Sequence, residues 1–147
     1  MVRLLAKILF FPAASLALGA AYQAVHPEGL WSLDPPAEMH EDGFARVTWG
    51  EAQPKVSSGA WLLVDAREPE QFAAQHIPGA VSLPANSYGE ALLFFAEEHA
   101  RNRPVVVYCG TEDCELSAEL AARLRDEAGF EDIRILRGGI LAWRRAP

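Results

Sequence analysis

The chain has 147 residues, of which 50% are hydrophobic and 22% are charged, a composition typical of a globular protein and not of a disordered one. Its formal net charge is −7, and Arg3 and Lys7 are the only charged residues before Glu28, so the acidity lies in the rest of the chain. An acidic domain repels polyanions, which argues against nucleic acid as a partner. The length suffices for one domain with a core and a terminal appendage.

The first 25 residues differ from all that follow. No charged residue lies between Ile8 and Val25, and two basic residues precede this stretch. About 20 apolar residues in a helix span a bilayer core, so residues 1–25 predict a hydrophobic helix that is either a transmembrane anchor or a cleaved signal peptide. A buried helix of a soluble protein is the third interpretation. Basic residues that flank a membrane segment stay on the cytoplasmic side. The anchor and the signal peptide therefore both place the domain outside the cytoplasm, either anchored on the periplasmic side of the membrane or secreted into the periplasm.

Residues 26–43 are expected to be a linker, and residues 44–147 the folded domain. The linker contains three prolines and two glycines and shows neither helical nor strand periodicity.

Apolar runs and helical patterns alternate through the rest of the chain. The predicted strands are 45–48, 61–65, 80–83, 105–108 and 133–136. The predicted helices are 49–56 with an interruption at Pro54, 69–75, 88–100, 115–128 and 140–144. Continuous apolar strands separated by helices indicate an α/β fold with a parallel sheet covered on both faces. The working site of such a sheet lies beyond the carboxyl ends of its strands.

Cys109 occupies such a position, directly after the strand that ends at Tyr108. The helical pattern that starts at Glu115 places this cysteine in a loop that leads into a helix. Backbone N–H groups there and the positive end of the helix dipole favour an anion, which predicts a stabilised thiolate. The alternative is a small apolar residue that only fills space at a strand end.

Several short motifs now point to a family. Their order and spacing resemble those of the rhodanese-like domain, over roughly residues 47–145. The motifs are Asp65-Ala66-Arg67, Phe72 before His76-Ile77-Pro78-Gly79-Ala80, Tyr108-Cys109, and Gly138-Gly139 with Trp143. The resemblance implies a doubly wound α/β fold around a five-stranded, mainly parallel sheet flanked by helices. It also implies that Cys109 is the nucleophile and holds sulfur as a persulfide.

The resemblance implies a loop of amides around this persulfide, and we expect neither a metal nor a cofactor. The loop residues expected to point their N–H groups at the sulfur are Gly110, Thr111, Glu112, Asp113, Cys114 and Glu115. The four histidines show no metal-ligand spacing with the two cysteines.

The loop departs from the family pattern. Glu112 and Cys114 stand where many active rhodanese-like loops have glycine and arginine, and Glu115 stands where related phosphatases have a phosphate-binding arginine. Phosphoryl transfer is therefore disfavoured. The three acids Glu112, Asp113 and Glu115 repel an anionic donor such as thiosulfate. We expect a small neutral or cationic sulfur donor, or a protein thiol as acceptor.

Cys114 leaves three hypotheses open. Cys109 and Cys114 are the only cysteines, they share one loop, and an oxidising compartment favours their pairing. Cys114 resolves the persulfide of a sulfur carrier, or the two form a thiol–disulfide redox pair, or a disulfide braces a non-catalytic binding module.

Three more residues are candidates for shaping the site. Asp65 ends a strand at the same edge as Cys109, and Arg67 follows it. The favoured interpretation is structural, with Asp65 accepting loop N–H groups and Arg67 pairing with a nearby acid such as Glu70. Arg137 follows the last strand and would add positive charge near the thiol, unless it is a solvated surface residue.

Overall fold

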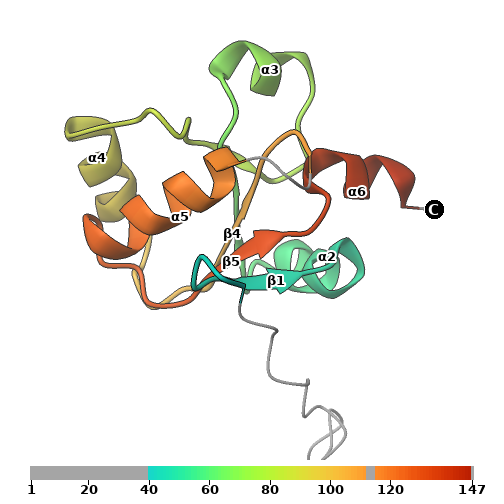
Figure 1. Cartoon of the computed structure of the whole chain (residues 1–147), viewed down its shortest axis with the longest axis horizontal. Helices are drawn as coiled ribbons and strands as arrows, with labels where there is room; N and C mark the ends of the chain where they lie inside the picture. The colour runs from blue at the N-terminus through green and yellow to red at the C-terminus, as the bar shows by residue number, and fades with distance from the viewer. Residues whose placement is uncertain (1–39, 112–114, 147) are drawn as a thin grey trace, which may run out of the picture. The chain divides into compact units, whose positions relative to one another are not determined.

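The computed structural model describes residues 40–111 and 115–146, which form a five-stranded sheet covered by helices (Figure 1). The strands are β1 (Ala45–Val47), β2 (Leu62–Asp65), β3 (Val81–Ser82), β4 (Val105–Tyr108) and β5 (Ile133–Leu136). Every pairing is parallel. The predicted fold class is confirmed. The hydrophobic helix predicted for residues 1–25 lies outside the described residues, as does most of the predicted linker, and no helix in the described ranges is long and apolar enough to span a membrane.

The strand order is β1-β5-β4-β2-β3, so β4 lies at the centre between β2 and β5. In the register between the two inner strands, Val64 pairs with Val107 and Asp65 with Tyr108. Because all strands run the same way, their carboxyl ends form one edge of the sheet. This register brings the end of β2 beside the residue that precedes Cys109.

Helices cover both faces of the sheet (Figure 1). They are α2 (Trp49–Ser57), α3 (Pro69–Ala74), α4 (Glu90–Glu98), α5 (Glu115–Asp126) and α6 (Gly139–Arg145). Along β4, Val105, Val107 and Cys109 pack in one apolar cluster with α4 and α5. Val106 and Tyr108 pack in the other cluster, with α2 and α6. All of β4 is buried, because alternate side chains of a central strand meet helices on opposite faces.

The helix α2 does not break at Pro54, where the sequence predicted an interruption. It continues to Ser57. A capping box holds its start, since the Thr48 side chain accepts from the Glu51 amide and the Glu51 carboxylate accepts from the Thr48 amide. Caps of this kind stabilise a helix by about 1 kcal/mol, which helps to offset the hydrogen bond that the proline cannot donate.

The structure predicts that His99, the residue after α4, makes the stability of the domain decrease in mild acid. Its ring lies edge-on to Phe95, with the centroids 4.6 Å apart. Its Nε2 is buried and has no hydrogen-bond partner in the described part of the chain. Burial lowers the pKa of His99, Arg103 lowers it further, and Glu98 opposes this shift. The fold therefore favours the neutral imidazole.

We expect this lowered pKa to reduce stability in mild acid. The unfolded chain binds a proton on His99 below about pH 6.5, whereas the folded domain binds it only at a lower pH. Stability is thus complete above that value and declines as the pH falls through it toward the folded pKa. The urea midpoint of His99→Gln should fall less between neutral pH and about pH 5 than that of the parent chain. Replacing the exposed His40 by glutamine is the control, and identical pH slopes for His99→Gln and the parent would contradict the prediction.

Candidate functional site

Cys109 lies directly beyond the carboxyl end of the central strand and is 1% exposed. Its side chain belongs to the apolar cluster beneath α4 and α5. The thiol donates a hydrogen bond to the carbonyl oxygen of Thr111, with Sγ and the oxygen 3.4 Å apart. The sequence therefore predicted correctly both the strand end and the loop, and the packing of this sulfur adds that it is screened from bulk water.

Only part of the cysteine loop is described. Gly110 and Thr111 follow Cys109, and Glu115 begins α5 with an exposed side chain. Glu112, Asp113 and Cys114 lie outside the described residues, so the predicted cradle of amides and the predicted pairing of the two cysteines stay predictions.

A glycine turn after β5 holds the backbone of Cys109. Gly138 and Gly139 both have positive φ, +77° and +53°, and they begin α6. The amide of Ile140 donates to the carbonyl oxygen of Cys109 at 2.9 Å. A Cβ on Gly139 would lie 2.4 Å from that same oxygen, closer than any side chain can approach. Only glycine allows this contact between the two loops.

Asp65 and Arg67 form a buried ion pair beside the thiol strand. The Arg67 Nε donates to Asp65 Oδ1 at 2.9 Å, and its Nη2 donates to Asp65 Oδ2 at 2.6 Å and to the carbonyl oxygen of Gln75 at 2.7 Å. The hydrogen bonds that Arg67 donates to Asp65 raise the pKa of Arg67. The suggested partner Glu70 was wrong, because the acid two residues away on the rigid end of β2 presents both oxygens to the guanidinium.

The same cluster secures Tyr108, the residue before Cys109. Its hydroxyl accepts from the Ile77 amide at 3.2 Å, its carbonyl accepts from the Ala66 amide at 2.8 Å, and its ring lies 5.8 Å from the Arg67 guanidinium carbon. Burial raises the pKa of the Tyr108 hydroxyl, which keeps it a neutral hydrogen-bonding group. Apart from their mutual ion pair, the described contacts of Asp65 and Arg67 are with backbone and with Tyr108, so their role in shaping the thiol site stays a prediction.

Breaking this ion pair should cost far more than breaking an exposed one. Asp65→Asn removes the charge opposite Arg67, whose side chain is 7% exposed, and we expect a loss of about 3 kcal/mol in the free energy of unfolding. The matched control is Asp132→Asn, because Asp132 pairs with Arg134 in a similar two-residue arrangement with 40% of the acid exposed. That variant should lose less than about 1 kcal/mol. Equal losses in urea titrations would contradict the prediction.

The surroundings of the motif residue His76 and of the candidate residue Arg137 are also described. His76 lies stacked on Phe72, with centroids 4.0 Å apart, and its Nδ1 is 2.9 Å from the Phe72 carbonyl oxygen, so it secures the turn before Ile77. Arg137 donates its backbone amide to Val47, and its exposed side chain is near enough to Glu51 to contribute to the lowered pKa of that acid, which is set mainly by hydrogen bonds from Thr48. A role of Arg137 at the thiol stays a prediction.

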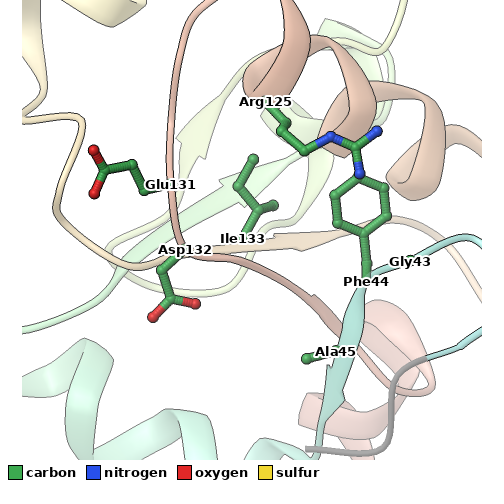
Figure 2. A pocket seen from close by; sticks show the side chains of 7 residues that line it. All are labelled: Gly43, Phe44, Ala45, Arg125, Glu131, Asp132 and Ile133. Carbon is green, nitrogen blue, oxygen red and sulfur yellow. The ribbon is translucent and has the colours of Figure 1, made fainter.

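A separate hollow of about 250 Å³ opens at the opposite edge of the sheet, where β1 and β5 begin. Figure 2 shows the guanidinium of Arg125 over the ring of Phe44, 4.7 Å from its centroid, with the carboxylates of Glu131 and Asp132 across the opening. This hollow lies away from Cys109 and is not part of the thiol site. Within the described ranges, no three His, Cys, Asp or Glu side chains gather closely enough to hold a metal ion.

The sequence of the folded part matches a known family. Residues 48–146 match the profile of the rhodanese-like domain. The chain belongs to the rhodanese-like domain family. This confirms the resemblance drawn from the motifs. The match runs from the cap of α2 to the residue after α6, and the edge strand β1 lies just before it.

Solved structures share the rhodanese-like fold. The BH2092 protein of Bacillus halodurans is 25% identical, with a TM-score of 0.60 over 68% of this chain and 71% of that one. A rhodanese-like domain from Anabaena sp. is 26% identical, with a TM-score of 0.54 over 67% of this chain and 72% of that one. A possible tyrosine phosphatase from Rhodopseudomonas palustris is 25% identical, with a TM-score of 0.53 over 69% and 80% of the two chains.

A curated relative is an HTH-type transcriptional regulator of Mycobacterium tuberculosis, 33% identical over 100 residues. The match covers 68% of this chain but only 42% of the regulator, so most of the regulator has no counterpart here.

One part of the site was missed by sequence reasoning. The sequence indicated the Gly138-Gly139 pair only as part of a family motif, whereas the pair lies against the backbone of Cys109. Two adjacent glycines at the carboxyl end of a strand are a signal for close backbone approach at the active edge of a parallel sheet, and this signal was available in the sequence.

Proposed function

We propose that the protein is a sulfurtransferase-like persulfide carrier in which Cys109 is the nucleophile. The observation that supports this most is the place of Cys109 in a rhodanese-like fold, at the carboxyl end of the central strand with its carbonyl held by the Ile140 amide. The backbone of Cys109 is held by this hydrogen bond, and we propose that the following loop controls which molecules reach the thiol. The proposed loop for binding the persulfide consists of Gly110, Thr111, Glu112, Asp113, Cys114 and Glu115.

The proposed reaction has two balanced steps. The Cys109 thiolate attacks the outer sulfur of a donor persulfide, the new S–S bond forms as the donor S–S bond breaks, and the donor leaves as a thiolate that takes up a proton. In the second step, an acceptor thiolate attacks the outer sulfur of the Cys109 persulfide. Cys109 leaves as a thiolate, and no oxidant or reductant is consumed.

Thiosulfate is expected to be a poor donor. Glu115 is exposed at the start of α5, and Glu112 and Asp113 precede it in the chain, so a dianion approaching Cys109 meets negative charge. We expect a neutral persulfide to load Cys109 at least about tenfold faster than thiosulfate at low salt, and the triple variant E112Q/D113N/E115Q to narrow that ratio. Stopped-flow loading rates over a range of salt concentrations check this. Equal loading rates of the parent chain with thiosulfate and with the neutral persulfide would contradict this prediction.

Intact-mass spectrometry of the full chain after incubation with a neutral persulfide tests the function itself. A gain of one sulfur on Cys109, lost again on addition of a thiol, is the expected result. The Cys114→Ser variant separates the roles of the second cysteine. If Cys114 resolves the persulfide, its thiolate attacks the inner sulfur, hydrosulfide leaves, and the parent chain forms a disulfide that Cys114→Ser does not.

Two other outcomes would replace this proposal. A chain that gains no sulfur but loses two hydrogens in a thiol–disulfide buffer is a redox protein, and a chain inert in both assays is a binding module. Phosphatase activity is disfavoured although a possible tyrosine phosphatase shares the fold, because Glu115 stands where a phosphate-binding arginine is needed. We do not propose a role in transcription for this chain, because the match covers less than half of the regulator and the chain is acidic.

We also propose that residues 1–25 hold the domain at the outer face of a membrane. The support is the uncharged stretch from Ile8 to Val25 behind two basic residues. Protease digestion of spheroplasts should remove the domain, whereas a domain protected until lysis would contradict this location.

A further inference from the structure

The helix α4 exposes two large apolar side chains that do not belong to the hydrophobic core. Leu93 is 57% exposed and Phe94 is 61% exposed, while Leu92, Phe95 and Ala96 on the opposite side of the helix are buried against the sheet. The helix thus has an inner apolar side, which is explained by the core, and an outer apolar pair, which is not. Adjacent exposed apolar side chains on a charged surface mark interaction sites.

The exposed apolar pair lies between acids. At 3.6 residues per turn, Glu90, Leu93, Phe94 and Glu97 fall on one face, which we call the α4 face. Glu90 and Glu97 are exposed, and neither forms an ion pair within the described ranges. The sequence of α4 contains no lysine or arginine. An apolar centre between two acids that form no ion pair in this part of the chain complements a basic amphipathic surface.

The α4 face begins at the edge of the sheet where Cys109 lies. The helix connects β3 to β4, and both strands run parallel to the rest, so its first residues lie at the carboxyl edge. Helix α5 begins at the same edge, directly after the cysteine loop, and covers the same face of the sheet (Figure 1). Its exposed first residues repeat the pattern, since Leu116 is 37% exposed next to the acid Glu115.

We propose that the α4 face docks a basic protein partner whose cysteine exchanges sulfur with Cys109. This inference rests on the proposed function for the thiol and names the class of its partner. Leu93 and Phe94 supply the apolar contact, and Glu90 and Glu97 attract lysine or arginine side chains around it. The same charge disfavours other occupants. Anionic lipid is repelled, and a second copy brings its own net charge of −7.

The probe is a synthetic peptide of about 20 residues, long enough to form a helix, with lysines flanking a leucine stripe and one cysteine. A second peptide has glutamate in place of each lysine. Binding is measured by fluorescence anisotropy on the full chain carrying Cys109→Ser, so that it does not depend on sulfur chemistry. Transfer is then measured as the rate at which the Cys109 persulfide passes sulfur to the peptide, with a small neutral thiol as the reference acceptor.

The test variant is Glu90→Lys/Glu97→Lys, and the control is Glu127→Lys/Glu131→Lys. The control makes the same change in net charge at exposed positions near the opposite edge of the sheet. We expect the test variant to weaken binding of the basic peptide, and to slow transfer to it, by about tenfold or more, with less than a twofold change in the control. Leu93→Ser/Phe94→Ser should weaken binding as well. Transfer to the small thiol should be unchanged in all of them.

Three results would overturn the inference: equal losses in the test and control variants, equal binding of the lysine and glutamate peptides, or self-association of the chain that the test variant abolishes, which would make a second copy the occupant. Failure of the proposed function is distinguishable from these. If no variant transfers sulfur to any thiol, but peptide binding still depends on Glu90 and Glu97, then the docking surface stands and the sulfur chemistry is wrong.

Discussion

Replacement of Cys109 by serine is expected to abolish sulfur uptake while leaving the domain folded. A hydroxyl is a far weaker nucleophile toward sulfur than a thiolate, so loading should fall by a factor of at least about a thousand, to background. The fold should tolerate the change because the serine hydroxyl can donate to the same Thr111 carbonyl that accepts from the thiol. We expect a change in the free energy of unfolding of about 1 kcal/mol.

Intact mass after donor treatment and urea unfolding of the same samples measure both effects. Cys114→Ser is the matched control, since it makes the same chemical change within the same loop and should still gain one sulfur. Sulfur gained by Cys109→Ser at the parental rate would show that the wrong cysteine has been assigned. Unfolding of Cys109→Ser would leave Cys109→Ala, which adds no polar atom to the apolar cluster, to decide the assignment.

The substitution Gly139→Ala is expected to disrupt the thiol site by displacing the backbone of the cysteine loop. The new Cβ would lie 2.4 Å from the Cys109 carbonyl oxygen and 3.2 Å from the carbonyl carbon of Gly110, so the backbone of the cysteine loop must move. The φ of +53° adds strain for any residue with a side chain. Together we expect a loss of about 3 kcal/mol in the free energy of unfolding, with slower sulfur uptake in the protein that remains folded.

Gly59→Ala separates the two causes. Gly59 has a φ of +76° with no atom within 4 Å of the position of a Cβ, so this variant pays only the conformational cost of about 1 kcal/mol. Its sulfur uptake should equal that of the parent chain. Urea midpoints and loading rates that are the same for the two alanine variants would mean that the contact between Gly139 and Cys109 has no effect on the site.

Local patterns predicted the elements of the fold well and their contacts poorly. The run Val105–Tyr108 is buried on both sides, so its apolar character alone predicted a central strand and the position of the cysteine after it. The partner of Arg67 was predicted wrongly, because Asp65 and Glu70 are similarly close to Arg67 in the chain and only the folded backbone determines which carboxylate faces the guanidinium. The sequence also predicted Phe94 wrongly as a core residue, because the helical pattern alone does not show which apolar residues of α4 face the sheet.

The sequence by itself determined the α/β class, the family and the residue on which the proposed chemistry depends, because apolar periodicity and short motifs are properties of neighbouring residues. Only the tertiary structure decided that Gly139 closes on the carbonyl of Cys109, that Asp65 holds Arg67 beside Tyr108, and which side of α4 stays outside. Each of these depends on the order β1-β5-β4-β2-β3, which brings distant segments to one edge of the sheet. Strand order follows from the packing of the whole chain, and no local pattern encodes it.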